Sequence, residues 1–301
     1  MNKSIFQVLL YYRYVDIKDP EKIKDQQRQL CEKLNLKGRI IVAKEGINGT
    51  LEGTLKNTEK YIKAMEKSKY FKGIVYRKSK GTGSAFPKFV LRVRDDIVSS
   101  AIKGLSLNPK EITGKYITPE ELHSWIHSEK EFFLVDMRND YETDVGYFKN
   151  SILSPFENFR DLPKILPILE NIKGKTIVTV CTGGVRCEKA SGFLLKNGFS
   201  DVYQLEGGIV TYMEKYPNED FLGTLYVFDG RITMGFNIED KKHVVVGKCK
   251  FCLTPAEKYY DCKNLYCVGK RHFISCEKCI QKTRSYCIKD CDAPKEFSVG
   301  I

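Results

Sequence analysis

The chain has 301 residues, of which 42% are hydrophobic and 29% charged, and its formal net charge is +12. This length predicts two or three modules of about 100 residues, each large enough to bury a core. No run approaches the roughly 20 apolar residues of a membrane span, and the apolar N-terminal segment lacks a small-residue cleavage site. We therefore expect a cytoplasmic protein with no membrane partner.

The excess positive charge is confined to the first part of the chain. Residues 1–120 contain 25 Lys and Arg against 13 Asp and Glu, whereas residues 121–301 contain 25 of each kind. A basic module joined to a neutral remainder is typical of polyanion binders, because contacts to phosphates release counterions. A lysine-rich surface without a partner would give the same count, so charge alone leaves both interpretations open.

The first module is expected to be a small α+β domain. Strand-like runs cover 6–14, 39–43 and 89–93, and a helix-like stretch covers 20–34. The stretch KEGINGTLEG, residues 44–53, contains three glycines, which predict either a tight turn or a close approach of the backbone to a neighbour. The candidate RNA contacts in this module are Lys44, Asn48, Arg92 and Arg94.

A linker over residues 107–115 precedes a second module, which opens with an N-capped helix at Thr118. Short apolar runs at 132–137, 151–153 and 176–181 alternate with helical stretches, which is the pattern of a parallel α/β sheet. His123 and His127 lie four residues apart on the first helix, as metal ligands can. The sequence offers them no evident carboxylate partner and no surrounding motif, so we expect an exposed or half-packed helix face instead.

The loop CTGGVR begins where a buried strand ends, at Cys181. Open α/β sheets bind ligands at this strand end, and glycines allow backbone amides to point at the thiol. The helix end contributes about 0.3 to 2 kcal/mol toward a thiolate, so the amides and Arg186 must supply the rest of a large pKa depression. Four residues separate Cys181 from Arg186, whereas cysteine phosphatases generally have five, and the smaller ring suits a sulfur atom better than a phosphate. Simple packing of a buried cysteine is the alternative.

CTGGVR resembles the active-site loop of rhodanese domains. LVDMRNDYETDVGYF, residues 134–148, resembles the stretch that precedes this loop in the family, and LEGGI, residues 205–209, resembles its closing motif. The resemblance implies that Cys181 is the nucleophile, that Asp136 and Arg138 support the loop, and that the sheet is rhodanese-like. The loop residues are Thr182, Gly183, Gly184 and Val185.

A narrower resemblance covers nearly the whole chain. GRIIVAKEGINGT, CTGGVRCEKAS, FLGTLYVFDGR and the final cysteine cluster together resemble the rhodanese-related tRNA uridine hydroxylases, which use molecular oxygen to form 5-hydroxyuridine at wobble position 34. The resemblance implies a tRNA anticodon arm as partner, and a catalytic set of Cys181, Arg186 and Cys187. Cys187 could capture an oxidised Cys181 as a disulfide, or it could be turned inward as packing.

Eight of the eleven cysteines lie between residues 249 and 291. Four close pairs are enough for two tetrathiolate sites, and structural zinc is favoured over disulfides in a chain without an export signal. An iron–sulfur cluster is the remaining alternative. Spacing does not say which pairs share an ion. The candidate ligands are Cys249, Cys252, Cys262, Cys267, Cys276, Cys279, Cys287 and Cys291.

The predicted architecture is α/β. A basic α+β, ferredoxin-like domain at 1–112 precedes a rhodanese-like parallel sheet with helices on both faces at 113–222, and a zinc-bound cysteine-rich module follows at 223–301. The leading hypothesis is a tRNA uridine 34 hydroxylase. The alternatives are a sulfurtransferase carrying a persulfide on Cys181 and a noncatalytic RNA-binding scaffold. The sequence shows no flavin or nicotinamide fingerprint and no convincing two-histidine, one-carboxylate iron site, so it does not explain how oxygen is activated.

Overall fold

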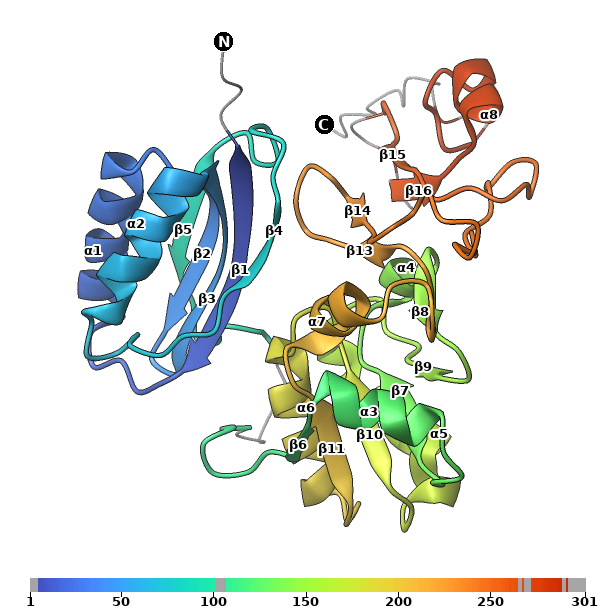
Figure 1. Ribbon diagram of the computed structural model, residues 1–301, viewed down its shortest axis with the longest axis horizontal. Coiled ribbons are helices and arrows are strands. Elements are labelled where there is room, and N and C mark those ends of the chain that lie inside the picture. The colour runs from blue at the N-terminus through green and yellow to red at the C-terminus, as the bar shows by residue number, and fades with distance from the viewer. Residues whose placement is uncertain (1–4, 101–106, 265–266, 268–271, 289–290, 292–301) are drawn as a thin grey trace, which may run out of the picture.

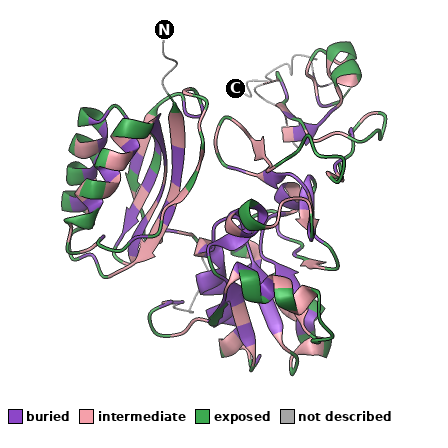
Figure 2. Cartoon of the chain, in the orientation of Figure 1, coloured by how far each residue is buried: buried purple, intermediate pink, exposed green. Residues whose placement is uncertain are grey.

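The computed structural model describes residues 5–100, 107–264, 267, 272–288 and 291. Within these ranges the chain forms two sheet domains and a smaller C-terminal module. In Figure 1 the first domain lies at the left, the second at the lower right and the C-terminal module at the upper right. Buried residues concentrate in the inner strands of the two sheets and on the helix faces that pack on them (Figure 2). No helix in the described part of the chain is both long and apolar enough to cross a bilayer.

The first domain is a five-stranded sheet of order β4-β1-β3-β2-β5. β1 is antiparallel to β3 and β4, β2 is antiparallel to β3, and β2 is parallel to β5. Helices α1 and α2 cover one face (Figure 1), so the chain order through β4 is the βαββαβ arrangement of a ferredoxin-like domain. The elements are β1 Phe6–Tyr14, α1 Pro20–Lys33, β2 Lys37–Ala43, β3 Gly46–Thr54, α2 Leu55–Glu66, β4 Arg77–Lys80 and β5 Phe89–Val93.

Residues 44–53 are mostly a strand, so a turn accounts for only their first two positions. β3 begins at Gly46, which pairs with Ala43 across the turn. Gly46 has φ of 152°, and a Cβ there would stand 2.0 Å from the carbonyl oxygen of Arg13 on β1. A Cβ at Gly49 would stand 2.4 Å from the ring of Tyr11. The glycines therefore allow β1 to approach β3 closely, which is the second of the two interpretations of this stretch.

The two faces of β1 serve different parts of the molecule, as the two-residue period of a strand requires. Leu9 and Tyr11 belong to the core of the first domain, where the hydroxyls of Tyr11 and Tyr61 lie 2.5 Å apart. Leu10 and Tyr12 face the second domain instead. Leu10 packs with that domain's core residues, and the Tyr12 hydroxyl donates to Glu188.

The second domain has a parallel sheet of order β6-β11-β10-β7-β9, which confirms the predicted parallel sheet. The residues of α3 and α7 form a core on one face, and those of α5, α6 and the 3-10 segment η1 form a core on the other. The elements are β6 Lys115–Ile117, α3 Pro119–Ile126, β7 Phe133–Asp136, α4 Asp140–Thr143, β8 Gly146–Phe148, β9 Ile152–Leu153, η1 Phe159–Ile165, α5 Leu166–Leu169, η2 Glu170–Ile172, β10 Ile177–Val180, α6 Val185–Lys196, β11 Val202–Leu205 and α7 Gly208–Lys215.

The C-terminal module is built from short hairpins and has a small core. β12 pairs with β8 of the second domain, which anchors the module there. Its most distal core contains the buried cysteines Cys262, Cys287 and Cys291 together with Phe273, so few apolar side chains support it. The elements are β12 Phe221–Gly223, β13 Leu225–Tyr226, β14 Thr233–Met234, β15 Tyr259–Asp261, β16 His272–Ile274 and α8 Glu277–Lys282.

Candidate active site

The Cys181 loop connects the C-terminal end of β10 to the N-terminus of α6. Gly184, with φ of 98°, is the N-cap of α6, and its amide donates to the Cys181 sulfur at 3.3 Å. The LEGGI stretch closes over the other side, where the Ile209 amide donates to the Cys181 carbonyl at 2.9 Å. A Cβ at Gly208 would stand 2.7 Å from that same carbonyl oxygen. The loop is therefore held rigidly from both sides.

These surroundings lower the pKa of the Cys181 thiol to about 6. Burial alone would raise it, but hydrogen bonds from the Cys187 thiol and from the amides of Arg186 and Cys187, together with the Arg186 charge, outweigh burial. Burial and the neighbouring Cys181 sulfur raise the pKa of Cys187 well above its ordinary value. The pair therefore holds one thiolate and one thiol at neutral pH, with the thiol donating to the thiolate.

We expect the thiolate absorbance of Cys181 to appear with a midpoint near pH 6, about 3 units below an ordinary cysteine. Because the folded pKa is lower than the unfolded one, the thiolate stabilises the fold above the unfolded pKa, and this contribution is lost as pH falls through about 6. The measurement is an ultraviolet pH titration from which the Cys181→Ser curve is subtracted. Cys187→Ala should shift the midpoint upward. A midpoint above 8 in the wild-type protein would contradict the assignment.

Arg186 acts within the protein and does not point freely into the pocket. Its guanidinium donates to both carboxylate oxygens of Glu142, at 2.5 and 2.8 Å, and to the Thr182 hydroxyl at 3.1 Å. Glu142 has no exposed surface. Sequence reasoning did not single out Glu142, although it lies in the quoted stretch 134–148. Its position fixes the guanidinium beside the thiolate.

The predicted loop supports, Asp136 and Arg138, form a fully buried ion pair at the end of β7. Arg138 Nε donates to Asp136 at 2.9 and 3.0 Å. The same guanidinium donates to the carbonyls of Gly146, at 2.7 Å, and Glu142, at 3.2 Å. The pair therefore fixes the α4 segment that carries Glu142, and its contact with the Cys181 loop is indirect.

A pocket of about 710 Å³ lies above the loop, where all three parts of the chain meet. This volume falls within the range of about 300–1,000 Å³ for small-molecule sites. Arg39 and Arg94 of the first domain and Arg160 of the second are exposed along it, and Phe228 of the C-terminal module is 44% exposed. Cys181 lines the pocket but has no exposed surface, so contact with its sulfur requires side chains at the pocket floor to move.

Two of the four candidate RNA contacts lie at this pocket. Asn48 and Arg94 line it, and the Asn48 amide donates to the carbonyl of Ile97 at 3.1 Å. Arg92 is exposed on β5 beside Ile41, which also lines the pocket, but Arg92 itself does not. Lys44 is exposed in the β2–β3 turn, away from the pocket lining.

The residues that follow Cys187 fasten the first domain to the second. Lys189 is 2% exposed and lies 3.0 Å from the carboxylates of both Glu45 and Asp96. Glu188 accepts from the hydroxyls of Tyr12 and Tyr116, at 3.0 and 2.9 Å. The helix that carries Cys187 is thus also the helix that contacts the basic domain, through Glu188 and Lys189. Sequence reasoning missed these contacts because their partners in the basic domain are distant in the chain.

The eight cysteines of the C-terminal module form two groups, each within 4.8 Å. The sulfurs of Cys252 and Cys276 are 3.7 Å apart, and those of Cys262 and Cys291 are 3.5 Å apart. A tetrahedral zinc tetrathiolate, with bonds of about 2.3 Å, places its sulfurs about 3.8 Å apart, whereas a disulfide bond is about 2.05 Å long. The donor sets therefore fit zinc. The groups alternate along the chain, the first being Cys249, Cys252, Cys276 and Cys279 and the second Cys262, Cys267, Cys287 and Cys291.

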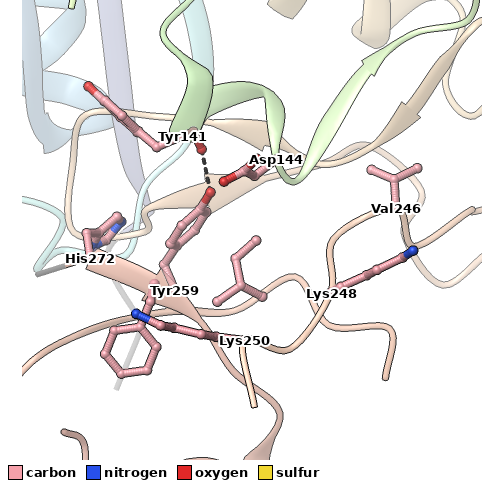
Figure 3. Close-up of a pocket in the computed structure, with 9 residues that line it drawn as sticks. Tyr141, Asp144, Val246, Lys248, Lys250, Tyr259 and His272 are labelled. Carbon is pink, nitrogen blue, oxygen red and sulfur yellow. Dashed lines mark hydrogen bonds between the residues drawn. The ribbon is translucent and has the colours of Figure 1, made fainter. Parts of the chain in front are cut away.

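A second pocket, of about 360 Å³, separates the C-terminal module from α4 (Figure 3). Tyr259 crosses it and donates its hydroxyl to the carbonyl of Tyr141. His272 stacks on Tyr259 with ring centroids 4.4 Å apart, and Lys248 and Lys250 also line the space. The described residues that line this pocket include no cysteine, whereas the lining of the first pocket includes Cys181.

The expectation that His123 and His127 lack a carboxylate partner is wrong. Asp220 lies 3.1 Å from both imidazoles, and Glu219 lies 3.7 Å from His123. The acidic residues follow the histidines by more than 90 positions, and the turn between α7 and β12 brings them together. No local pattern around the histidines could have indicated this pairing.

Three family models match the chain in succession: a UPF0176 acylphosphatase like domain at 6–97, a rhodanese-like domain at 118–215 and a rhodanase C-terminal region at 222–292. A tRNA uridine(34) hydroxylase from Bacillus cytotoxicus is 46% identical over 268 residues, which cover 88% of this chain and 82% of the relative. One from Bacillus mycoides is 45% identical and covers 88% and 83%. The chain belongs to the tRNA uridine(34) hydroxylase family.

Solved structures resemble this member of the tRNA uridine(34) hydroxylase family over about one third of its length. A rhodanese-like domain protein from Staphylococcus aureus is 34% identical and covers 33% of this chain and 90% of its own, with a TM-score of 0.28. The family assignment confirms the resemblance drawn from the four sequence motifs.

Proposed function

We propose that this chain hydroxylates carbon 5 of uridine 34 in tRNA, with Cys181 as the catalytic thiol and molecular oxygen as co-substrate. The observation that carries the proposal is the pocket in which the Cys181 loop meets exposed arginines of the basic domain. The curated relatives named tRNA uridine(34) hydroxylase match both of these parts.

The substrate is a tRNA anticodon arm with its wobble base turned out of the stack. Single-stranded loop bases can be splayed into protein pockets and stacked on aromatic side chains. Phe228 offers such a ring at the pocket, and Arg39, Arg94 and Arg160 would neutralise the flanking phosphates. Because tRNA is the substrate, the expected location is the cytoplasm.

The Cys181 thiolate would add to C6 of the uracil. This forms a sulfur–carbon bond and leaves the electron pair at C5, which attacks oxygen and, once protonated, gives a C5 hydroperoxide. Loss of the C5 proton then breaks the sulfur–carbon bond, restores the C5–C6 double bond and releases the Cys181 thiolate. The thiolate attacks the outer oxygen of the hydroperoxide, which gives 5-hydroxyuridine and a Cys181 sulfenic acid, and the Cys187 thiol converts this acid to a disulfide and water. Overall, uridine, oxygen and two thiols give 5-hydroxyuridine, water and one disulfide, so Cys181 and Cys187 together supply the two electrons. A cellular dithiol reductant restores the pair. The hydrogen bond between the two thiol groups supports this partnership.

The two cysteine groups of the C-terminal module would each hold a structural zinc ion. Closed tetrathiolate coordination provides folding energy and no open position for chemistry. Zinc would therefore fix the module that carries Phe228 at the pocket, while the reaction takes place at the thiol pair.

The test is mass spectrometry of wobble nucleosides from a deletion strain that expresses variants of this chain. Wild type should restore 5-hydroxyuridine only under oxygen. Cys181→Ser should leave 5-hydroxyuridine at background, because the variant lacks the thiolate that adds to the uracil. Cys31→Ser is the matched control, since Cys31 is a buried cysteine in the first domain, remote from the pocket. Full modification by Cys181→Ser would refute the proposal.

The second candidate is a sulfurtransferase that carries a persulfide on Cys181. The lowered pKa of this thiol and the rhodanese-like loop favour it, because both suit sulfane sulfur transfer. The basic domain and the cysteine module are not needed for that reaction. Rapid turnover of thiosulfate and cyanide, together with unmodified U34, would establish this alternative.

A further inference from the structure

Two histidines and two carboxylates form a compact cluster away from the Cys181 pocket. His123 and His127 lie one turn apart at the C-terminal end of α3, and they face Glu219 and Asp220, which precede β12. His123 Nδ1 and His127 Nε2 each lie 3.1 Å from an Asp220 carboxylate oxygen, and His123 Nε2 lies 3.7 Å from Glu219 Oε2. One candidate ligand atom from each residue lies within 4.8 Å of the others.

We propose that this cluster binds a divalent transition-metal ion of the Zn²⁺ class. The four residues offer one ligand atom each within 4.8 Å of one another, whereas ligand atoms about 2.1 Å from a tetrahedral ion stand about 3.4 Å apart. One ion would take a single nitrogen of His123, which now faces Asp220 through Nδ1 and Glu219 through Nε2, so binding requires small rotations of these side chains. Imidazole and carboxylate ligands suit zinc and its neighbours in the first transition row better than Mg²⁺ or Ca²⁺. Two histidines four residues apart on a helix present both rings to one ion.

The charge balance of the cluster favours a cation. The Asp220 side chain is 6% exposed, and its ion-pair partners within the described residues are the two histidines. Two carboxylates that lie side by side, one of them buried, are stabilised by a bound cation. A divalent ion would compensate both carboxylates and would take the two imidazoles as further ligands.

Neighbouring side chains already orient the ligands. The Tyr212 hydroxyl donates to Asp220 at 2.5 Å, and the Tyr216 ring stacks on His123 with centroids 3.9 Å apart and planes within 4°. Such outer contacts fix ligand orientation in metal sites. Both tyrosines lie toward the C-terminal end of α7, whereas Gly208 at the other end contacts the Cys181 loop. The eight residues of α7 span about 12 Å, so the ion would join α3 to the α7–β12 connection and would not touch the reacting base.

The experiment counts metal ions in the full-length protein after Zn²⁺ loading and removal of excess ion, by elemental mass spectrometry. Wild type should hold one ion more than His127→Ala, whatever the occupancy of the cysteine groups, and uridine hydroxylation should be unchanged by this substitution. The His127 side chain is 54% exposed, so the variant should fold. After Co²⁺ loading, the spectrum of wild type minus that of His127→Ala should show visible absorption bands of the bound ion. This difference should contain no sulfur-to-metal charge-transfer band, because the cluster has no cysteine ligand.

His243→Ala provides the control, because His243 contacts one carboxylate, Glu257, and the Asn218 amide oxygen, and belongs to none of the metal-ligand groups in the described residues. It should hold as many ions as wild type. Equal ion counts in wild type and His127→Ala would overturn the proposal, since the histidines and carboxylates would then form only a hydrogen-bonded cluster. That result would leave the proposed uridine hydroxylation unaffected.

Discussion

Glu142→Ala is expected to destabilise the second domain by about 3–5 kcal/mol, because the substitution leaves the buried Arg186 guanidinium without its carboxylate. The variant should also lose uridine hydroxylation, since nothing else in the described residues holds that guanidinium in a two-point contact beside the Cys181 thiolate. Urea unfolding of the purified variant measures the stability, and wobble-nucleoside analysis measures the activity.

Glu131→Ala is the control for this prediction. Glu131 also pairs with a basic residue, Lys175, but its side chain is 67% exposed, so its loss should cost less than about 1 kcal/mol. Glu142→Gln keeps the size and one hydrogen-bond acceptor, and it should fall between the two. If Glu142→Ala unfolds at the wild-type urea concentration, the Arg186–Glu142 pair does not have the role assigned to it.

The Cys181 loop could be located from sequence because every part of it is local. A buried strand, a thiol, two glycines and an arginine lie within a dozen residues, and the strand end alone determines where the loop opens. The parallel sheet was equally accessible, because its strands alternate with helices in chain order. Periodicity and spacing therefore predict the position of the loop and the type of sheet from neighbouring residues alone.

The contacts that adjust the loop could not be found in this way. Glu142 reaches Arg186 across 44 positions, and Lys189 reaches Asp96 across 93. The first pair depends on how distant segments of one domain pack and the second on how two domains pack, and a single sequence records neither distance. The same limit explains the error over His123, whose carboxylate partner Asp220 is 97 positions away.

The glycines of residues 44–53 show a different limit. Glycine permits a turn, and it also permits close packing of a strand, so composition cannot separate the two. At Gly46 the structure requires both, because the residue ends the turn and also lies against the backbone of Arg13. Whether a glycine forms a turn or allows close packing depends on which strand lies beside it, and the order of strands in the sheet determines this.

Spacing does not say which cysteine pairs share an ion, and the structure resolves them into two alternating groups. An ion in each group would close a loop that contains part of the other group. Loss of one site therefore removes a constraint from both, and the two should fail together.

Cys249→Ser is accordingly expected to unfold most of the C-terminal module. Structural zinc contributes an apparent 10–16 kcal/mol in small zinc domains at neutral pH, and the core here has too few apolar side chains to compensate. The second domain should stay folded, because its own strands and helices supply most of both cores, to which the C-terminal module adds Phe221 and Leu225. Limited proteolysis should cut after residue 223, and bound zinc should fall from two equivalents in the cysteine groups toward none.

Cys31→Ser distinguishes loss of a ligand from loss of a buried thiol. Cys31 is as buried as Cys249, with no exposed surface for either, but it lies in the first domain, outside both groups. It should keep both zinc ions and resist proteolysis. A Cys249→Ser protein that keeps one zinc ion and a protease-resistant module would show that the two sites are independent, and that the apolar contacts of the module support it better than its small core indicates.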